Sequence, residues 1–298
     1  MTDTAFSPTL LSGKRILITG GGTGLGRGVA RYLVEHGAEV HLWGRRAAVL
    51  AEAAAEASAS RPGSVFHHTV DVRDYENVDA TVGRIWSEHG PLTGVLNNAA
   101  ANFIAQTKDL SPRAFQAITS TVMNGSFHTT HAVGKRWIAE GLPGSVLSTL
   151  TTWVWTGSAY VVPSAMAKAA VHSMTMSLAV EWAKYGIRVN ALAPGPIPTD
   201  YAWEMLNPTD KSSVGATQAD QIPAGRTGTI EELANLTMFL LSDACDYLTG
   251  QTIAMDGGQM LAGPGTFAGL SNLTDADWAQ IRDSSKAASE SSKAERTV

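Results

Sequence analysis

The chain carries near its start a glycine-rich segment, residues 19–26, whose sequence is Thr-Gly-Gly-Gly-Thr-Gly-Leu-Gly. It follows a β-branched run at 15–19 and precedes a helix-like window at 25–36. Glycines between a strand and a helix let the backbone approach a pyrophosphate group, which the helix N-terminus then faces. The segment therefore favours a dinucleotide site, although the same glycines could form an ordinary tight turn. The predicted contacts are Gly20, Thr23, Gly24, Leu25 and Gly26.

Two arginines, Arg45 and Arg46, follow the second β-branched run, residues 39–43. An NAD-binding protein usually presents an acid there to the ribose 2'-hydroxyl. An arginine fork instead pairs with a 2'-phosphate, so the sequence predicts NADP(H) rather than NAD. The alternative is that both arginines are solvated at the start of a helix. Asp71 ends the third run and could accept from the adenine amino group or cap the next turn.

The elements that must position these residues alternate along the chain. Short β-branched runs are followed by longer windows typical of helices, such as 25–36 and the alanine-rich stretch 47–59. This alternation predicts an α/β fold with a parallel sheet covered on both faces. We expect one domain over residues 1–298, with a core at about 12–260 and a C-terminal extension at about 261–298. The seven predicted strands are 15–19, 39–43, 65–70, 94–96, 145–147, 188–192 and 252–255.

Three stretches interrupt this alternation. Residues 194–198, Pro-Gly-Pro-Ile-Pro, cannot continue a strand or a helix, and they open a loop-like region to about Gly228 that is typical of a lid. Residues 257–269 form a glycine-rich turn region, and 273–278 predict a short N-capped helix. The composition beyond Asp283 predicts a solvated or frayed tail.

Composition excludes several classes of partner. The 298 residues contain 22 Lys plus Arg against 27 Asp plus Glu, a net charge of −5 with no long basic run. Nucleic acid and anionic membranes therefore lack an electrostatic attraction to the chain, and a small-molecule ligand is expected. No apolar stretch approaches the length of a membrane span. One cysteine, Cys245, cannot form an internal disulfide.

Localisation and metal binding follow from what the sequence lacks. Residues 1–12 carry no export or organelle signal, and the final Arg-Thr-Val is no peroxisomal tripeptide, so a cytoplasmic location is expected. We predict no metal site, because the histidines lack metal-ligand spacing with carboxylates. These histidines are His67, His68, His128, His131 and His172.

Several motifs accompany the glycine-rich segment. They are residues 97–100 (Asn-Asn-Ala-Ala), 186–190 (Gly-Ile-Arg-Val-Asn), Pro194-Gly195 and 256–258 (Asp-Gly-Gly), together with Lys168 in a helical window. Over about residues 12–260 the chain resembles the short-chain dehydrogenase/reductase family. The resemblance implies a single-domain Rossmann fold, a doubly wound seven-stranded parallel sheet, and a homo-oligomer that is usually a tetramer.

The chain departs from that family at one chemically important position. The family normally carries Tyr-x-x-x-Lys, whereas the matching residues here begin with Ser164 and end with Lys168. Ketone reduction needs a phenol of lowered pKa to protonate the alkoxide, and a serine hydroxyl is a far weaker acid. Lys168 can still hold the nicotinamide ribose, and Ser164 can donate a hydrogen bond from the same helix face. The alternative for Ser164 is a helix-start cap after Pro163.

One branch of the family lacks that tyrosine, and the sequence is similar to it: the 2,4-dienoyl-CoA reductases. The similarity rests on residues 97–103, 110–112, 123–125, 156–158, 161–165, 194–197, 228–236 and 273–274. In that branch NADPH delivers hydride to the far end of a conjugated dienoyl thioester, within fatty acid β-oxidation, and water protonates the dienolate. The chemistry needs hydrogen-bond donors aimed at the thioester oxygen. The resemblance assigns this role to Asn102, whose alternative is to satisfy a turn backbone.

The resemblance also assigns further contacts. Arg73, Phe103 and Ser111 would contact the acyl chain or CoA, although Phe103 could be plain core and Arg73 a surface charge that touches nothing. The catalytic set is then Asn102, Ser164 and Lys168. The cofactor set gains Val72, Asn98, Pro194, Gly195 and Ile197 beside Arg45, Arg46, Asp71 and Lys168.

Two departures bear on the substrate. Relatives in this branch add a tyrosine donor near Trp153 or Val154, which is absent here, and Tyr160 is the nearest phenol. Met205 stands where relatives offer an arginine to the CoA phosphates. Trp153 and Tyr160, with Trp155 and Trp203, could line an aromatic pocket for a conjugated or cyclic substrate, or could simply pack as large side chains.

These observations predict an NADPH-dependent enzyme that reduces a conjugated carbon–carbon double bond in an acyl-CoA-like thioester. Two alternatives stay open. The first is a carbonyl or alcohol oxidoreductase in which Tyr160 is a relocated acid. The second is an NADP-binding protein with impaired catalysis.

Overall fold

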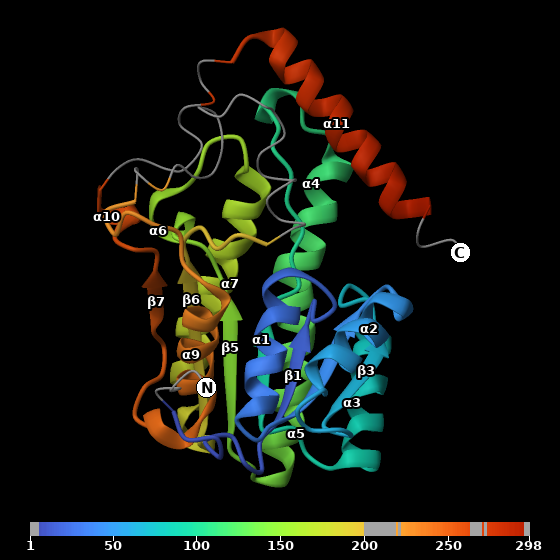
Figure 1. The fold of residues 1–298 in the computed structure, drawn as a ribbon, viewed down its shortest axis with the longest axis vertical. Coiled ribbons are helices and arrows are strands. Elements are labelled where there is room, and N and C mark those ends of the chain that lie inside the picture. Colours follow the sequence, from blue (N-terminus) through green and yellow to red (C-terminus); the bar gives the residue numbers. More distant parts are fainter. Residues whose placement is uncertain (1–5, 200–218, 220–221, 263–269, 271–272, 295–298) are drawn as a thin grey trace.

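Seven parallel strands form one sheet in the computed structural model, in the order β3-β2-β1-β4-β5-β6-β7, which confirms the predicted Rossmann-type fold (Figure 1). The structure describes residues 6–199, 219, 222–262, 270 and 273–294. The strands are β1 (Arg15–Thr19), β2 (Glu39–Gly44), β3 (Val65–Thr69), β4 (Gly94–Asn97), β5 (Gly144–Thr149), β6 (Ile187–Pro194) and β7 (Thr252–Met255). Each predicted strand is present, and the bounds differ by at most two residues.

Helices cover both faces of the sheet, because neighbouring side chains on a strand point to opposite faces. Ile16 and Ile18 pack on one face with α1 (Gly24–Glu35), α2 (Ala47–Ala57) and α9 (Ile230–Leu241). Leu17 packs on the other face with α3 (Tyr75–His89), α5 (Gly125–Glu140) and α7 (Val162–Trp182). The remaining helices in the described part of the chain are α4 (Pro112–Thr119), α6 (Trp153–Thr156), α10 (Gln259–Ala262), α11 (Asp275–Ala294), and the short turns η1 (Thr107–Asp109), η2 (Ser120–Asn124), η3 (Ala183–Tyr185) and η5 (Asp243–Cys245).

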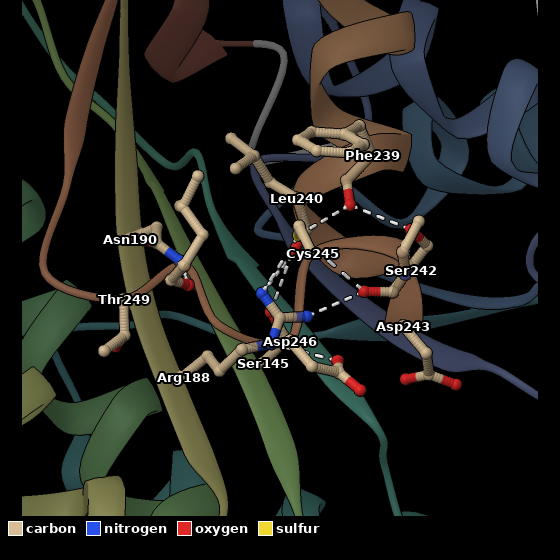
Figure 2. A network of polar contacts seen from close by, with 12 residues as sticks. Ser145, Arg188, Asn190, Phe239, Leu240, Ser242, Asp243, Cys245, Asp246 and Thr249 are labelled. Atoms are coloured by element: carbon tan, nitrogen blue, oxygen red, sulfur yellow. Dashed lines mark hydrogen bonds and ion pairs between the residues drawn. The ribbon is translucent and has the colours of Figure 1, made fainter.

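Arg188 on β6 anchors the C-terminal end of α9, at the edge of the sheet where the strands begin (Figure 2). Its guanidinium Nη1 donates to the carbonyl of Leu240 at 3.0 Å, and Nη2 donates to the carbonyl of Ser242 at 2.7 Å. Helix ends leave carbonyls without a partner inside the helix, and a cation there also complements the helix dipole. The side chain is 11% exposed, so these hydrogen bonds lie out of bulk water.

Arg188→Met is therefore expected to lower the free energy of unfolding by about 2–4 kcal/mol, since it leaves buried carbonyls unpaired. Urea denaturation followed by circular dichroism measures this loss. The matched control is Arg31→Met, whose side chain is 49% exposed and should cost less than about 0.5 kcal/mol. A loss of that small size for Arg188→Met would contradict the anchoring role.

Of the two alternatives for the chain beyond Asp283, a frayed tail is wrong, because α11 continues to Ala294, whereas a solvated tail agrees with the exposure of most of residues 284–290. Thr274 and Asp277 begin the helix with reciprocal hydrogen bonds: the Asp277 amide donates to Thr274 Oγ1, and the Thr274 amide donates to Asp277 Oδ2. Trp278 and Ile281 are then buried at 3% and 0% exposure. Their packing secures the helix, which the polar composition alone does not reveal.

Two loop expectations have separate outcomes. Pro194 is the last residue of β6, paired with Met255 of β7, so the strand runs one residue into the Pro-Gly-Pro segment. The following position, Gly195, donates its amide to the carbonyl of Met255 at 2.9 Å. Most of the expected lid, with Trp203 and Met205, lies outside the described residues.

Among the described residues, no helix combines the length and apolar character needed to cross a membrane.

Candidate active site

A cavity of about 720 Å³ opens beyond the carboxyl ends of the central strands, where doubly wound folds bind their ligands. Strands β2, β5 and β6 contribute residues to it, as do the segments that follow β1, β3 and β4. The residues singled out from the sequence that line it are Gly20, Thr23, Gly24, Leu25, Arg45, Arg46, Asp71, Val72, Asn98, Asn102, Phe103, Trp153, Ser164, Lys168, Pro194, Gly195 and Ile197.

The glycine-rich turn at the floor of the cavity has room for backbone only. Gly20 has φ +67°, and a Cβ there would lie 2.9 Å from Ala99 Cα. A Cβ at Gly26 would lie 2.6 Å from Asn98 Nδ2, and Gly26 itself does not line the cavity. The Asn98 amide donates to the carbonyls of Thr19 and Gly20, at 3.2 and 3.3 Å. The turn is thus held in a shape that leaves space for a pyrophosphate before α1.

The end of the cavity beside β2 is rich in guanidinium groups. Arg45 and Arg46 line it, and Arg46 is the residue that precedes α2. Asp71 faces the same space, but its carboxylate accepts from the backbone amide of Arg73 at 3.1 Å and from its Nε at 2.9 Å. These hydrogen bonds hold the pKa of Asp71 below its usual value. Arg73 does not line the cavity. Its guanidinium group is hydrogen-bonded to Asp71 instead.

At the opposite end, Lys168 and Ser164 lie one helical turn apart on α7 and are buried at 5% and 3% exposure. The Lys168 ammonium donates to the carbonyl of Thr149 at the end of β5. Burial lowers the pKa of Lys168 to about 8. The side chain of Ser164 makes no capping bond, because the residue that precedes α7 is Val161 and no side chain caps that helix. No described residue is hydrogen-bonded to its hydroxyl, which lies on the cavity wall and can donate to a ligand.

Asn102 lies in the loop after β4, and its amide has one fixed side. The Oδ1 oxygen accepts from the backbone amide of Phe103 at 2.9 Å. Within the described part of the chain nothing accepts a hydrogen bond from its Nδ2 group. The turn-satisfying alternative for Asn102 is therefore compatible with donation, because the oxygen holds the turn while the amide protons are available to the cavity.

The aromatic wall is smaller than the tryptophan and tyrosine positions predict. Trp153 and Phe103 line the cavity, whereas Trp155 is 43% exposed and packs against His172. Tyr160 lies outside the lining, and its ring packs against Trp278 with centroids 4.5 Å apart. Ser111 caps α4 by accepting from the amide of Ala114 at 3.1 Å, and it also lies outside the lining.

Several lining residues were not predicted from the sequence, and one group of them comes from the C-terminal helix. The α11 residues that line the cavity are Ser285, Lys286, Ala288 and Ser289. A signal for them exists in the sequence, because Trp278, Ile281, Ser285 and Ser289 follow the spacing of one helix face.

At the edge of the sheet opposite the cavity, three described residues have ligand atoms that could reach one metal ion. They are Glu39, His41 and His89. These atoms lie within 4.8 Å of one another. The Glu39 carboxylate already accepts from Arg15 Nε and from His41 Nε2, at 2.5 and 3.1 Å. Burial lowers the pKa of His41 to about 4, so its ring is neutral. The hydrogen bonds within the cluster are then enough to satisfy the polar atoms of the ring. None of these three residues lines the cavity, and the contacts within the cluster account for their arrangement.

Comparisons with known proteins agree with the fold. A family profile described as Enoyl-(Acyl carrier protein) reductase matches residues 20–260. The chain is 40% identical over 260 residues to a Caenorhabditis elegans protein named probable 2,4-dienoyl-CoA reductase 3. The aligned region covers 87% of this chain and 84% of the relative. A Bacillus anthracis short chain dehydrogenase structure has a TM-score of 0.75 at 39% identity, over 83% of this chain and 96% of its own. A Burkholderia cenocepacia gluconate 5-dehydrogenase, in complex with NADP and tartrate, has a TM-score of 0.79 at 30% identity, over 86% and 99%.

Proposed function

The chain belongs to the short-chain dehydrogenase/reductase family, and from that premise we propose that it is an NADPH-dependent reductase of a conjugated carbon–carbon double bond in a 2,4-dienoyl thioester. The observation that carries the proposal is a pair of features in the lining of one cavity. Ser164 stands where a phenolic acid would be needed for ketone reduction, and Asn102 offers an amide donor whose orientation its own turn fixes. A thioester oxygen that gains charge needs such a donor rather than an acid.

The residues that would hold NADPH fit its groups. The glycine turn before α1 has space for the pyrophosphate, Arg45 and Arg46 suit a 2'-phosphate, and Lys168 with Ser164 suits the ribose and amide of the nicotinamide end. When bound, NADPH supplies a hydride. Lys168 is fixed by the carbonyl of Thr149, so it can orient the reactive end without searching among rotamers.

The chain's own contribution to the reaction is electrostatic. Hydride addition at the far end of the diene moves an electron pair along the conjugated chain to the thioester oxygen. The Asn102 Nδ2 group donates a hydrogen bond to that oxygen and lowers the energy of the charged state. Water then protonates the carbon chain, which restores the thioester carbonyl with one double bond fewer. Phe103 and Trp153 line the cavity and suit a flat conjugated chain.

The direct test is the loss of NADPH absorbance when the purified enzyme is mixed with a 2,4-dienoyl-CoA, compared with simple ketones and saturated acyl-CoA. Turnover of the dienoyl substrate alone is expected. Turnover confined to ketones would contradict the proposal and favour a relocated acid. No structural observation favours that alternative, since the Tyr160 ring packs on Trp278 outside the cavity lining.

The cofactor preference gives a second expected outcome. Replacing Arg45 and Arg46 by serine removes two charge-assisted partners of the 2'-phosphate, so the Kd for NADPH should rise about 10- to 100-fold. The Kd for NADH should stay within about twofold, because NADH lacks that phosphate. Fluorescence titration measures both constants, with Arg31→Ser as the exposed control. Equal losses for NADPH and NADH would contradict the assignment.

We also propose a homo-oligomer, the tetramer that the family resemblance implies. Large apolar side chains stand exposed on neighbouring elements, including Phe127 on α5 at 51% and Val180 on α7 at 83%. Apolar faces of this kind are typical of subunit contacts. Sedimentation or light scattering of the purified chain measures the assembly.

A further inference from the structure

The first half of α11 is fastened to the loop that carries the proposed donor. Trp278 and Ile281 are buried with Ile104 and Val161 in one apolar cluster, and the Trp278 ring packs against Tyr160. Ile104 follows Asn102 by two residues, so this packing ties the helix to the reacting end of the cavity. Burial of Trp278 and Ile281 gives the helix a fixed position.

Ion pairs reinforce the same contact. The Arg282 Nη1 atom lies 3.3 Å from Asp109 Oδ2, and the Lys108 Nζ atom lies 4.0 Å from Asp275 Oδ1. Both partners of α11 belong to η1, which directly follows the loop of Asn102 and Phe103. These contacts of the first half of α11 set the direction of its second half. Figure 1 shows the helix crossing beyond the carboxyl ends of the strands toward α2.

The chemistry of the helix face changes where it reaches the cavity. The stripe that begins with Trp278 and Ile281 continues at helical spacing with Ser285, Ala288 and Ser289, and all three of these line the cavity with Lys286. A face that packed against protein would stay apolar. Small side chains, hydroxyls and an ammonium group instead suit a surface that contacts a polar ligand.

The charges around the cavity identify the ligand class. Its described lining contains four cations, Arg45, Arg46, Lys168 and Lys286, against one acid, Asp71, which accepts hydrogen bonds from Arg73. Two acidic residues of α11, Asp283 and Glu290, flank the lining residues 285–289. Neither of them lines the cavity. A lining with more cationic than acidic side chains attracts phosphate groups.

We propose that Lys286, carried on the C-terminal helix, binds a phosphate group of a nucleotide ligand, with Ser285 and Ser289 beside it as hydroxyl donors. This proposal deepens the proposed function and rests on it for the identity of the ligands. NADPH and an acyl-CoA both carry suitable phosphates, in the 2'-phosphate of the first and the 3'-phosphate and pyrophosphate of the second. The C-terminal extension is then part of ligand selection.

The test uses binding alone, in the full-length protein, so that it does not depend on turnover. Calorimetry gives Kd for four probes: NADPH, NADH, coenzyme A and pantetheine. The probes form two pairs, NADPH with NADH and coenzyme A with pantetheine, and the first of each pair carries the additional phosphates. In one of these pairs, Lys286→Glu should raise the Kd of the first probe at least about tenfold, equal to about 1.4 kcal/mol, and leave the Kd of the second unchanged. A change for NADPH but not NADH assigns the 2'-phosphate, and a change for coenzyme A but not pantetheine assigns the CoA phosphates.

Two further variants keep the result interpretable. Lys184→Glu, an exposed cation outside the cavity lining, should leave all four constants within about twofold. Trp278→Ala should weaken the same probe as Lys286→Glu, because it releases the helix that carries the lysine. Constants unchanged by Lys286→Glu overturn the proposal, as does a loss with Trp278→Ala alone. Phosphate-dependent binding without dienoyl turnover would instead reject the proposed reaction and leave the phosphate contact standing.

Discussion

Asn102→Ala is expected to lower kcat on a 2,4-dienoyl-CoA by roughly 100- to 1,000-fold, the usual cost of removing one preorganised oxyanion donor. The Kd for NADPH should stay within about twofold, since Asn102 is assigned to the substrate oxygen. Stopped-flow measurement of NADPH oxidation separates the chemical step from product release. Because the amide oxygen holds only the backbone of Phe103, the change in protein stability should be about 1 kcal/mol.

Asn102→Asp sharpens this experiment. Aspartate keeps the size of the side chain and can still accept from the Phe103 amide, yet its carboxylate cannot donate a hydrogen bond and repels the developing charge. Its kcat should fall at least as far as that of the alanine variant. Asn77→Ala, an exposed position on α3, is the matched control and should retain full activity. A kcat above about a third of wild type for both Asn102 variants would contradict the role.

Lys168→Met is expected to lower kcat/KM about 100-fold and to raise the Kd for NADPH about tenfold or more, since the ammonium is the proposed anchor of the ribose. Its effect on stability should have the opposite sign. Burial lowers the pKa of Lys168 from its usual value to about 8, so below that pH the folded protein carries a buried charge that the unfolded chain exposes. Methionine removes the charge, and the variant should be about 1–3 kcal/mol more stable at pH 7.

The pH dependence follows from the same pKa. Between about pH 8 and 10.5 the unfolded chain binds a proton at Lys168 that the folded chain has lost, so the free energy of unfolding of the wild type should rise with pH in this window. Lys168→Met should remove that rise, whereas Lys184→Met should keep it. Urea denaturation at several pH values measures the slope. A wild-type curve that falls through this window, or a variant less stable than wild type, would contradict the account.

The strands and the nucleotide end of the site follow closely from the sequence. Buried parallel strands are short runs of β-branched residues, and the glycine turn between β1 and α1 has a spacing that few other structures require. Lys168 and Ser164 are likewise predictable as neighbours, because one helical turn separates them. Such predictions depend on local spacing, which the sequence states directly.

The outer wall depends on contacts between distant segments. Tyr160 is adjacent to the site in sequence, yet its ring packs against Trp278, more than a hundred residues away. Arg73 turns back on Asp71, and a single sequence does not reveal which of two nearby charges will pair. The lining role of Lys286 requires α11 to be anchored first, and that anchor consists of two apolar residues in an otherwise polar tail.

The central claim is that an amide donor, rather than a phenolic acid, stabilises the charge formed on the substrate. A crystal structure of the protein with NADP+ and a 2,4-dienoyl-CoA tests it most directly. We expect the Asn102 Nδ2 atom within about 2.7–3.2 Å of the thioester oxygen, with the diene over the nicotinamide ring. An Asn102 side chain turned away from that oxygen, with another residue donating in its place, would contradict it.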